Sequence, residues 1–469
     1  MKHYTHIMLS ITALLCMPPL CAEFTVYIVN NTGNPNTKIY VLVKGLNPHT
    51  KKQTFIKFVK GSPVGTYADV TTPDADVHNP KQSLDYGYDY TDFKDERGNY
   101  ALHLPYLESG RVYISLDNKL KMPIVGAAPH VGIADPSPFN TNDPSYQYLY
   151  DKVEFTYLPN GVTVINPTAV DCISLPITVT QKKMVHNKEE EVVYGIEHSR
   201  EKTFKDIDAI LKAPGNSPEW ARLIIKNDQG EILRIVAPGR DDAFFNPKYL
   251  DDYIEALWKY YKEHDLSIDC SELKNIIKGL GSYTFVGRVN DKDIFVFKNQ
   301  PGEGKSAAIV NIGKPASKNF FLADQGPFQA PNNTLEAVIV RNICSAWSVG
   351  LLPTTSVLNR DFFMRQKDAH NFYKDNTILP TTGENKPWYN LYAKAIHQVS
   401  KDIYAWAYDD AIGLDGTNFS TDTYAATLTI GRLTEAPAVP ATPKTSSLNP
   451  LSKTKNPIRI SQAQPKRRA

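Results

Sequence analysis

The chain is poor in cysteine, and the few cysteines that it has are far apart. Only 5 of its 469 residues are cysteine. Loss of a leader that carries Cys16 and Cys21 would leave Cys172, Cys270 and Cys344. An odd number of widely spaced cysteines excludes a dense disulfide framework and a Cys-x-x-Cys metal or redox motif. At most one bridge can form within the chain, and its two partners stay open.

Strong net charge and long apolar runs are missing as well. The formal net charge is +2, so no field over the whole molecule attracts nucleic acid or acidic lipid. Beyond the N-terminal segment no run is apolar enough to cross a membrane. The sequence also lacks a His-Glu-x-x-His zinc motif and a Gly-x-Ser-x-Gly nucleophile turn. We therefore expect no nucleic-acid partner and no membrane span.

The two ends of the chain differ from its middle. Lys2 precedes the apolar run 7–15, and Ala22 supplies a small residue before a cleavage site. We predict a signal peptide over residues 1–22 and export to the periplasm or the medium, with a buried first strand as the alternative. In residues 433–469 proline alternates with small polar and basic residues, which predicts a disordered basic tail. A plain solvated tail is favoured over one that binds an anionic surface.

Short strands dominate the first part of the chain. Segments with strand-forming residues, separated by turns, are 24–29, 38–43, 100–104, 111–116, 153–157, 162–165 and 175–179. This spacing is typical of a β-sandwich or barrel. The 26 tyrosines suit either the surface of a sheet or a ligand with flat apolar faces, such as a sugar.

Helical periodicity appears after about residue 182. Helices are predicted at 202–211, 247–264, 271–280, 335–349 and 389–399, with strands at 223–225, 232–236, 283–286 and 293–297. Strands are predicted again at 402–408 and 421–430. The middle of the chain is therefore expected to be mixed α/β.

One carboxylate lies in a predicted hairpin. Strand alternation puts Glu154 and Thr156 on the face opposite Val153, Phe155 and Tyr157. An Asn-Gly turn follows at residues 160–161, which is a strong hairpin signal. A carboxyl group flanked by apolar side chains can keep its proton, as a general acid requires. A solvent-exposed glutamate is the more frequent outcome for such a position.

A second carboxylate, Asp171, is the only charge between Gly161 and Val179. A turn-capping role would also account for an isolated aspartate. In a regular two-residue hairpin Glu154 faces Pro167, which leaves Asp171 roughly 13 Å further along the strand. Pro167 must end that ladder, so the chain turns here.

Asp409 and Asp410 form a competing pair of acidic residues. Neighbours on a strand point to opposite faces, so we do not expect both to act on one bond. One of them can still line a cleft.

Together these segments carry a resemblance to a known family. Glu154-Phe155-Thr156, Val170-Asp171 and Ser174-Leu175-Pro176 resemble the core of glycoside hydrolase family 64, the bacterial β-1,3-glucanases that include laminaripentaose-producing enzymes. Further segments that look like the family are 109–115, 220–238, 245–261 and 404–410, the last being similar to a signature of thaumatin-like proteins. The resemblance extends over residues 24–432.

The resemblance implies a mainly β fold with an α/β part. A thaumatin-like β-barrel or sandwich would begin in residues 23–181. A mixed α/β domain over 182–345 would be inserted, and residues 346–432 would return to the barrel. A wide acidic cleft would run between the two domains. The charged segment 181–191 departs from the family and is interpreted as a local insertion.

The resemblance also implies the activity. The chain is expected to be an endo-β-1,3-glucanase, that is, a glucan endo-1,3-β-glucosidase. It would cut glucans of the laminarin or curdlan type into short oligosaccharides by an inverting mechanism. Glu154 would be the general acid and Asp171 the general base, about 6.5–9.5 Å apart, with no metal or organic cofactor.

The same resemblance implies the substrate contacts. Thr156 corresponds to a substrate-binding threonine, Asn166 and Thr168 match polar positions of the cleft, and Asp410 is expected to contact substrate. Leu158 stands where the family often has a polar contact. We expect a monomer. The alternatives are a non-catalytic glucan-binding protein on the same barrel and a surface protein that binds a partner through its basic tail.

Overall fold

The computed structural model describes residues 23–186, 188–302, 307–329, 334–374, 386–414 and 423–435. The predicted signal peptide and residues 436–469 of the predicted tail lie outside the described residues. Residue contacts divide the chain after Glu435, so all of the elements below belong to one unit.

The fold is mainly β, and its largest part is a sheet of twelve strands. Its members are β1 (Phe24–Asn30), β2 (Ile39–Leu46), β3 (Gln53–Val59), β4 (Ser62–Asp69), β5 (Tyr88–Asp89), β6 (Ala101–Leu104), β7 (Leu107–Leu116), β10 (Tyr150–Tyr157), β11 (Thr163–Pro167), β13 (Ile177–Val185), β14 (Lys188–Gly195) and β22 (Thr423–Ile430). Their order is β11-β10-β7-β2-β3-β4-β6-β1-β22-β13-β14, and β5 pairs with β2.

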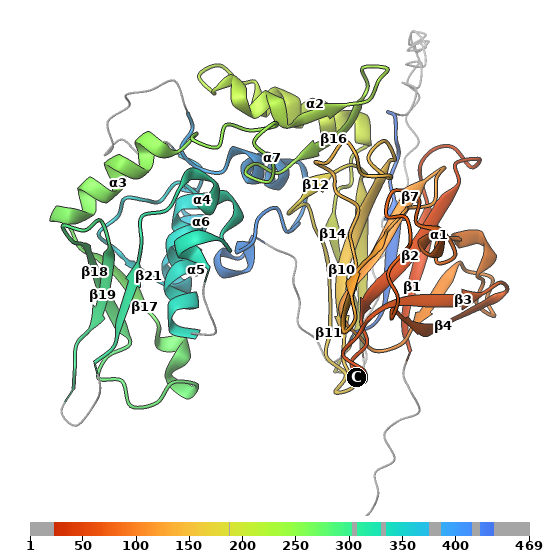
Figure 1. Cartoon of the computed structure of the whole chain (residues 1–469), viewed down its shortest axis with the longest axis horizontal. Coiled ribbons are helices and arrows are strands. Elements are labelled where there is room, and N and C mark those ends of the chain that lie inside the picture. The colour runs from red at the N-terminus through yellow and green to blue at the C-terminus, as the bar shows by residue number, and fades with distance from the viewer. Residues whose placement is uncertain are drawn as a thin grey trace, which may run out of the picture. The chain divides into compact units, whose positions relative to one another are not determined.

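The sheet curves until its two ends meet. β11 begins the strand order, yet it also contacts β13, β14 and β22 at the other end. The Thr163 hydroxyl on β11 donates to the Thr423 carbonyl on β22 at 3.4 Å. The result is a nearly closed, barrel-like sheet (Figure 1).

Strand alternation fills the interior of this barrel. On β1 every second residue, Phe24, Val26 and Ile28, is buried in the core. On β10 the alternation buries Val153, Phe155 and Tyr157, as the sequence predicts. Because side chains on a strand point to opposite faces in turn, the residues between them remain on the outer face.

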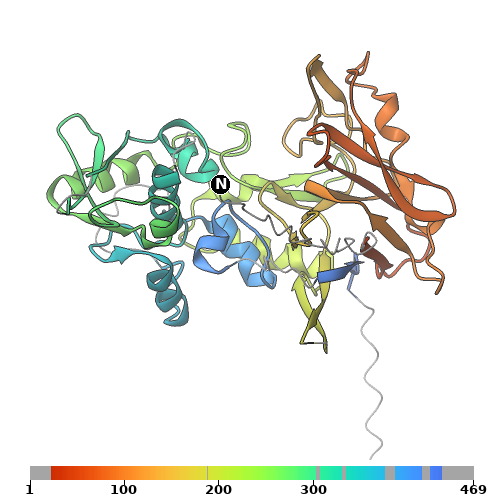
Figure 2. The same cartoon turned by 90° about the horizontal axis from the view of Figure 1, so that it is seen from below.

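The last described strand completes the sheet beside the first one. β22 runs parallel to β1, with Thr25 opposite Ala425, and antiparallel to β13, with Ile177 opposite Ile430. Figure 2 shows the blue β22 next to the red first strand.

The charged segment that we interpreted as an insertion forms the β13–β14 hairpin. Lys182 faces Glu191 and Lys183 faces Glu190. The Lys182 ammonium lies 3.0 Å from the Glu191 carboxylate. β14 is the last strand in the sheet order, and a row of charges on such an edge disfavours pairing with another chain.

Smaller sheets and helices make up the rest of the described chain. The strands are β8 (Ile124–Ala127), β9 (His130–Ile133), β12 (Cys172–Ile173), β15 (Ile224–Lys226), β16 (Ile232–Val236), β17 (Leu266–Asp269), β18 (Thr284–Val289), β19 (Phe295–Asn299), β20 (Ile309–Ile312) and β21 (Val357–Leu358). They form sheets ordered β8-β9, β12-β16-β15 and β20-β19-β18-β17-β21. The helices are α1 (Lys81–Leu84), α2 (Arg200–Leu211), α3 (Asp251–Glu263), α4 (Ser317–Leu322), α5 (Thr334–Ser348), α6 (Arg360–Asp368) and α7 (Leu391–Val399).

Short 3-10 turns complete the list of elements. They are η1 (Tyr90–Asp92), η2 (Pro218–Leu223), η3 (Ser271–Asn275), η4 (Gly326–Phe328) and η5 (Asp409–Ile412). A second core, centred on the buried Trp220, Trp258 and Trp347, joins these helices to the small sheets. The predicted helices at 202–211, 247–264, 335–349 and 389–399 are confirmed within a few residues by α2, α3, α5 and α7.

Two predicted elements are wrong. Residues 402–408 form turns instead of a strand, because the buried Asp409 carboxylate accepts the N–H groups of Ala405 and Trp406 and bends the chain. The helix predicted over 271–280 is only the short η3, which ends at Asn275, and Gly279 further on takes a φ of 88°, outside the helical region.

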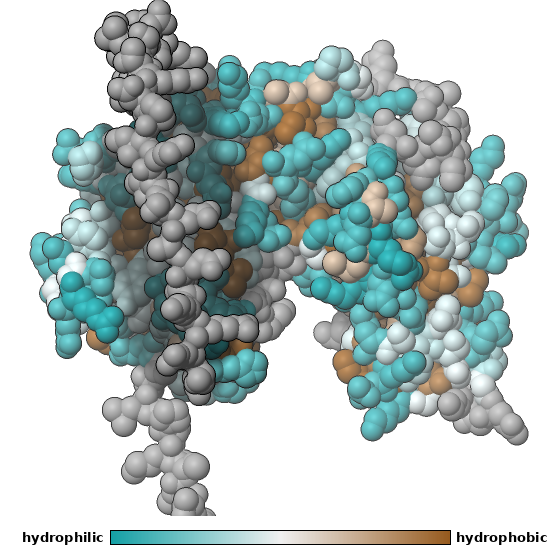
Figure 3. Space-filling view, turned by 180° about the vertical axis from the view of Figure 1, so that it is seen from behind, coloured by the Kyte–Doolittle hydropathy of each residue, from teal (hydrophilic) through white to brown (hydrophobic). Residues whose placement is uncertain are grey.

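The large hydrophobic side chains that are exposed in the described part of the chain come from many elements. Among the large ones Val59, Ile276 and Ile309 are the most exposed, and they come from different elements. Figure 3 shows mostly hydrophilic residues on the face that it displays. None of the described helices is both long enough and apolar enough to cross a membrane.

Candidate active site

The β10–β11 hairpin sets the position of Glu154. Its turn differs from the predicted two-residue loop, because the Gly161 N–H bonds to the Leu158 carbonyl and the Leu158 N–H to the Val162 carbonyl. Pro159 is at a turn position that suits its fixed φ, and Gly161 takes a φ of 83°. The extra loop residue shifts the register by one, so Glu154 faces Asn166 rather than Pro167.

A bulge on the other side of β10 opens space beside Glu154. Phe155 pairs with Gly110 and Tyr157 with Leu107, so two residues of β7 oppose Thr156 alone. Ser109, at the bulge, takes a φ of 48° and donates its N–H to the Thr156 hydroxyl at 3.3 Å. The bulge directs the Thr156 side chain along the outer face.

A pocket of about 230 Å³ lies over this part of the sheet. Its lining consists of Ser109, Gly110, Arg111, Glu154, Phe155, Thr156, Val164 and Asn166. Three of the predicted site residues, Glu154, Thr156 and Asn166, are therefore brought together on one outer face. The Glu154 side chain is 36% exposed, which suits a group that must reach a ligand.

Asp171 reaches the same region because the chain leaves the ladder after Pro167, as the sequence predicts. The Ala169 N–H bonds to the Tyr404 carbonyl, and the Tyr392 hydroxyl donates to the Ala169 carbonyl at 2.6 Å. β12 then pairs with β16, with Cys172 opposite Val236. These contacts turn the chain back toward β10.

Lys152 joins the two carboxylates. Its ammonium lies 2.5 Å from Asp171 Oδ2 and 3.7 Å from Glu154 Oε1. The distance between those two oxygens therefore cannot exceed the sum of the two contacts, about 6.2 Å. Retaining glycosidases hold their carboxyl groups roughly 5–5.5 Å apart and inverting ones roughly 6.5–9.5 Å. The bound is below the separation expected for an inverting pair, so these contacts show that the carboxylates can act on one bond but do not favour inversion over retention.

The surroundings of Asp171 keep it ionised. Burial alone would raise the pKa of its carboxyl group, but the Lys152 ammonium and the Arg240 guanidinium outweigh burial and lower the pKa below its ordinary value. Arg240 lies 3.1 Å from Asp171 Oδ1. Burial likewise opposes the charge of Lys152, yet Asp171 and Glu154 raise the pKa of this lysine.

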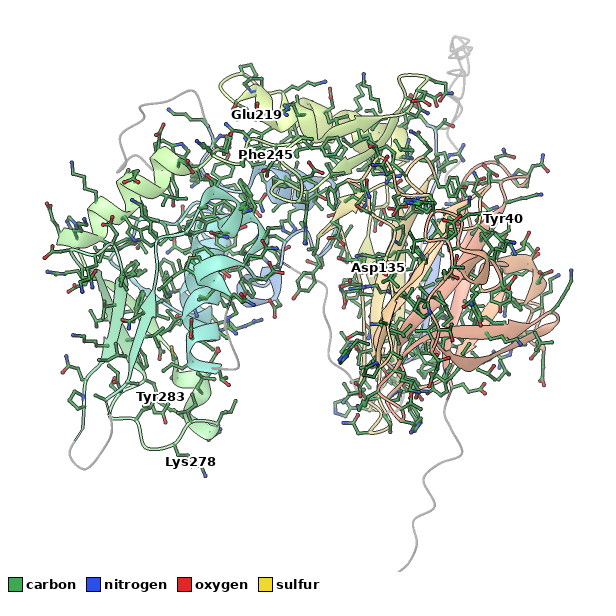
Figure 4. The ribbon with its side chains drawn as sticks, in the orientation of Figure 1. Tyr40, Asp135, Glu219, Phe245, Lys278 and Tyr283 are labelled. Carbon is green, nitrogen blue, oxygen red and sulfur yellow. The ribbon has the colours of Figure 1, made fainter. Side chains whose placement is uncertain are left out.

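On the β7 side of Glu154, further charged side chains extend across the sheet. Lys44 on β2 faces Arg111 on β7, Arg111 faces Glu154, and Glu154 faces Asn166. Arg111 Nε donates to Glu154 Oε1 at 3.2 Å. The Asp135 carboxylate, labelled in Figure 4, pairs with both Lys44 and Arg111.

These contacts form one continuous chain of alternating charges, which we call the ionic row. Its members in order are Lys44, Asp135, Arg111, Glu154, Lys152, Asp171 and Arg240. Four cations face three carboxylates, so this part of the site is not acidic, in contrast to the expected acidic cleft. Lys152 could have been found from sequence, since it lies two residues before Glu154 on the same strand face.

A buried aspartate joins the two segments that carry the catalytic candidates. Asp151 precedes Lys152, and its Oδ2 accepts the N–H groups of Ser174 at 2.8 Å and Leu175 at 3.1 Å. Its Oδ1 accepts the Lys152 N–H at 2.9 Å. Burial outweighs these bonds and raises the pKa of Asp151 to about 6. The carboxylate thereby ties β10 to the segment that follows Asp171.

Two predicted substrate residues lie elsewhere. Thr168 is buried, forms an isolated bridge with Tyr404, and is not among the residues that line the Glu154 pocket. Asp410 is on η5, which packs against α5 and α6, and its carbonyl accepts a bond from Arg360 at 2.9 Å. Their contacts with substrate stay predictions.

Comparison with known proteins gives one family match. A family model described as β-1,3-glucanase, of glycoside hydrolase family 64, matches residues 22–430. A comparison with curated proteins finds no match.

Three solved structures are similar in fold. A laminaripentaose-producing β-1,3-glucanase in complex with laminaritetraose is 20% identical, with a TM-score of 0.68 over 88% of this chain and 100% of the other. A family 64 β-1,3-glucanase domain from Clostridium beijerinckii is 24% identical, with a TM-score of 0.64 over 88% and 100%. A laminaripentaose-producing family 64 enzyme from Paenibacillus barengoltzii is 18% identical, with a TM-score of 0.53 over 87% and 75%.

Proposed function

Because the chain belongs to glycoside hydrolase family 64 and hydrolyses β-1,3-glucan, we propose that it is an endo-acting enzyme that inverts the anomeric carbon. Glu154 is the general acid and Asp171 the general base in this proposal. The observation that carries the assignment is the shared contact with Lys152, which holds both carboxylates within reach of one glycosidic bond.

Asp171 suits the role of the base. Lys152 and Arg240 hold the pKa of its carboxyl group below the ordinary value, so the group is ionised at neutral pH. An ionised carboxylate can take a proton from water as that water attacks the anomeric carbon. Oδ2 is held by Lys152 and Oδ1 by Arg240, so both oxygens have a fixed direction when the water approaches.

Glu154 suits the role of the acid through its place in the pocket. The leaving sugar oxygen must take a proton from it as the bond breaks. Asn166 faces Glu154 across the ladder and Thr156 lies two residues further along β10; both line the pocket and can bind sugar hydroxyls.

The finer description of the fold also belongs to this proposal. The barrel is thaumatin-like, with the mixed α/β residues 182–345 inserted before the chain returns at 346–432, and a wide cleft between the two parts receives the glucan. Asp410 and Thr168 contact substrate there. The enzyme is a monomer that a signal peptide over residues 1–22 sends to the periplasm or the medium. The family match supports catalysis over the alternative of a non-catalytic glucan-binding protein.

Digestion of laminarin followed by analysis of the fresh product tests the proposal. Glu154→Gln and Asp171→Asn should each lower the rate of hydrolysis by roughly 10²–10⁴-fold while circular dichroism shows an intact fold. Proton NMR during the first minutes should show the α-anomer, because inversion converts a β-linkage into an α-product. A first product with the β-anomer would show retention and would remove Asp171 from the role of base.

A further inference from the structure

A second pocket, of about 700 Å³, lies on the barrel away from the ionic row. We call it the tyrosine pocket. Its lining consists of Tyr27, Ile28, Val29, Asn30, Tyr90, Arg97, Gly98, Asn99, Tyr100, Lys182, Glu189, Tyr424 and Thr427. None of these residues lines the Glu154 pocket. By the shorter way round the barrel, β22 and β11 lie between its central strand β1 and β10, which carries Glu154.

The floor of the tyrosine pocket is the outer face of two neighbouring strands. Tyr27 on β1 lies beside Thr427 on β22, and both alternate with core residues. Tyr27 is half-buried, so part of its ring is accessible. This pair provides an aromatic surface next to a hydroxyl.

Tyrosine side chains line two sides of the pocket above this floor. On one side Tyr90 and Tyr100 meet with their ring centroids 4.8 Å apart, which fixes the Tyr100 ring beside the turn that carries Arg97. On the other side the Tyr424 hydroxyl bonds to Glu189 on the β13–β14 hairpin, which holds the Tyr424 ring in place although 39% of the residue is exposed.

The charges of the pocket favour a neutral ligand rich in hydroxyl groups. Lys182 is already paired with Glu189 at 3.8 Å and Glu191 at 3.0 Å. Within the described part of the chain, the Arg97 guanidinium has no ion-pair partner and remains a donor. One unpaired cation beside several tyrosines gives little attraction for a polyanion, whereas aromatic faces with nearby donors and acceptors suit sugar rings. The volume is in the usual range for a ligand site.

We propose that the tyrosine pocket binds a segment of β-1,3-glucan without cutting it. The identity of this ligand rests on the proposed function, since a long glucan is the neutral polyhydroxylated polymer that the enzyme meets. A chain held in the tyrosine pocket keeps other parts of the same polymer near Glu154, which raises their effective concentration at the active site. Short oligomers cannot occupy both sites at once and gain nothing from the second site.

Binding stoichiometry tests this proposal directly. The full chain with Glu154→Gln, which is expected to hydrolyse the ligand far more slowly, is titrated calorimetrically with laminarihexaose. Two binding sites per chain are expected. Adding Tyr27→Ala with Tyr424→Ala should leave one site, and Arg97→Ala, an exposed change that leaves the sheet intact, should weaken the second site by roughly threefold to tenfold. Tyr40→Ala, at a half-buried tyrosine on β2 labelled in Figure 4, is the matched control and should keep both sites.

Activity assays of variants that keep Glu154 distinguish a failure of this proposal from a failure of the proposed function. Tyr27→Ala with Tyr424→Ala should lower hydrolysis of insoluble curdlan and leave hydrolysis of laminarihexaose unchanged. A single site in every variant, or two sites that survive the tyrosine changes, overturns the second-site proposal even when the enzyme hydrolyses laminarin. Absence of laminarin hydrolysis by the unmodified chain overturns the proposed function whatever the stoichiometry.

Discussion

Lys152 places its ammonium 2.5 Å from Asp171 Oδ2, although Asp171 lies 19 positions further along the chain and outside β10. The contact depends on the turn after Pro167 and on the Asp151 carboxylate, which fastens the neighbouring backbone. It makes Lys152 a positioning residue for the proposed base and gives it influence over the charge of Asp171.

Replacing Lys152 by methionine should shift the acid limb of the pH profile. The pKa of Asp171 is lowered in the folded protein, so the catalytic carboxylate stays ionised until the pH falls below the ordinary range of an aspartate. Without the ammonium, burial raises that pKa, and kcat/KM for laminarin should begin to fall at a higher pH. The measurement is kcat/KM from pH 3 to 8, and Lys60→Met, at a lysine that is 84% exposed, is the control. Identical acid limbs in Lys152→Met and the unmodified enzyme would contradict the role given to Lys152.

Asp151 should make the protein less stable as the pH rises, because its pKa is raised in the folded protein, whereas the pKa of Asp171 is lowered. Its folded pKa of about 6 is above the value of 3.8 for an unperturbed aspartate, so its contribution to stability is fully present below about pH 3.8 and is lost as the pH rises through about 6. Asp151→Asn removes this titration. The difference in unfolding free energy between the unmodified protein and Asp151→Asn should therefore shrink by on the order of 2–3 kcal/mol between pH 4 and pH 7.

Urea unfolding at several pH values measures this difference. Asn also offers a poorer acceptor to the Ser174 and Leu175 N–H groups, so Asp151→Asn should be less stable than the unmodified protein at pH 4, by about 1–3 kcal/mol. A difference that grows with pH would show that the carboxyl group is not raised in pKa.

Gly110 should not tolerate a methyl group. A Cβ at this position would lie 2.6 Å from the Phe155 ring and 2.9 Å from a Leu107 methyl. Phe155 is in the barrel core and cannot move without loss of packing. Gly110→Ala should cost about 1–3 kcal/mol of stability and should also lower activity, because Gly110 lines the Glu154 pocket. Gly132→Ala, where nothing lies within 4 Å, should change stability by less than about 0.5 kcal/mol, and thermal unfolding compares the two.

The three described cysteines should behave as unreactive thiols. Cys172, Cys270 and Cys344 are free and buried, which settles the open question of a bridge among them. Burial raises the pKa of each thiol, so little reactive thiolate forms at neutral pH. An alkylating reagent followed by peptide mapping should label none of the three in the native protein and all three in denaturant without reductant. Failure to label two of them in denaturant would indicate a disulfide.

Local patterns predicted most of the elements that build the site. The alternation in β10 put Glu154 and Thr156 on the outer face, and the rule against proline inside a ladder ended β11 at Pro167. The register was wrong by one residue, because the hairpin loop has three residues and not two. That single residue brought Asn166, and not Pro167, opposite Glu154.

The approach of Asp171 to Glu154 could not be read from spacing. It depends on Tyr404, Tyr392 and β16, which are distant in sequence and meet the segment after Pro167 only in the folded chain. The partners of the carboxylates were missed for the same reason, since Asp135 and Arg240 belong to loops with no regular period. The strand predicted at 402–408 failed because the buried Asp409 overrides local propensity with its bonds to the backbone.

The pairing of β22 with β1 and β13 has a consequence for how the protein is made. β22 lies between β1 and β13 in the sheet, and about nine-tenths of the sequence must be synthesised before β22 can form. Until then β1 and β13 keep open hydrogen-bonding edges, and such edges recruit strands from other chains. Premature termination before Thr423 should therefore yield aggregates instead of a shortened enzyme.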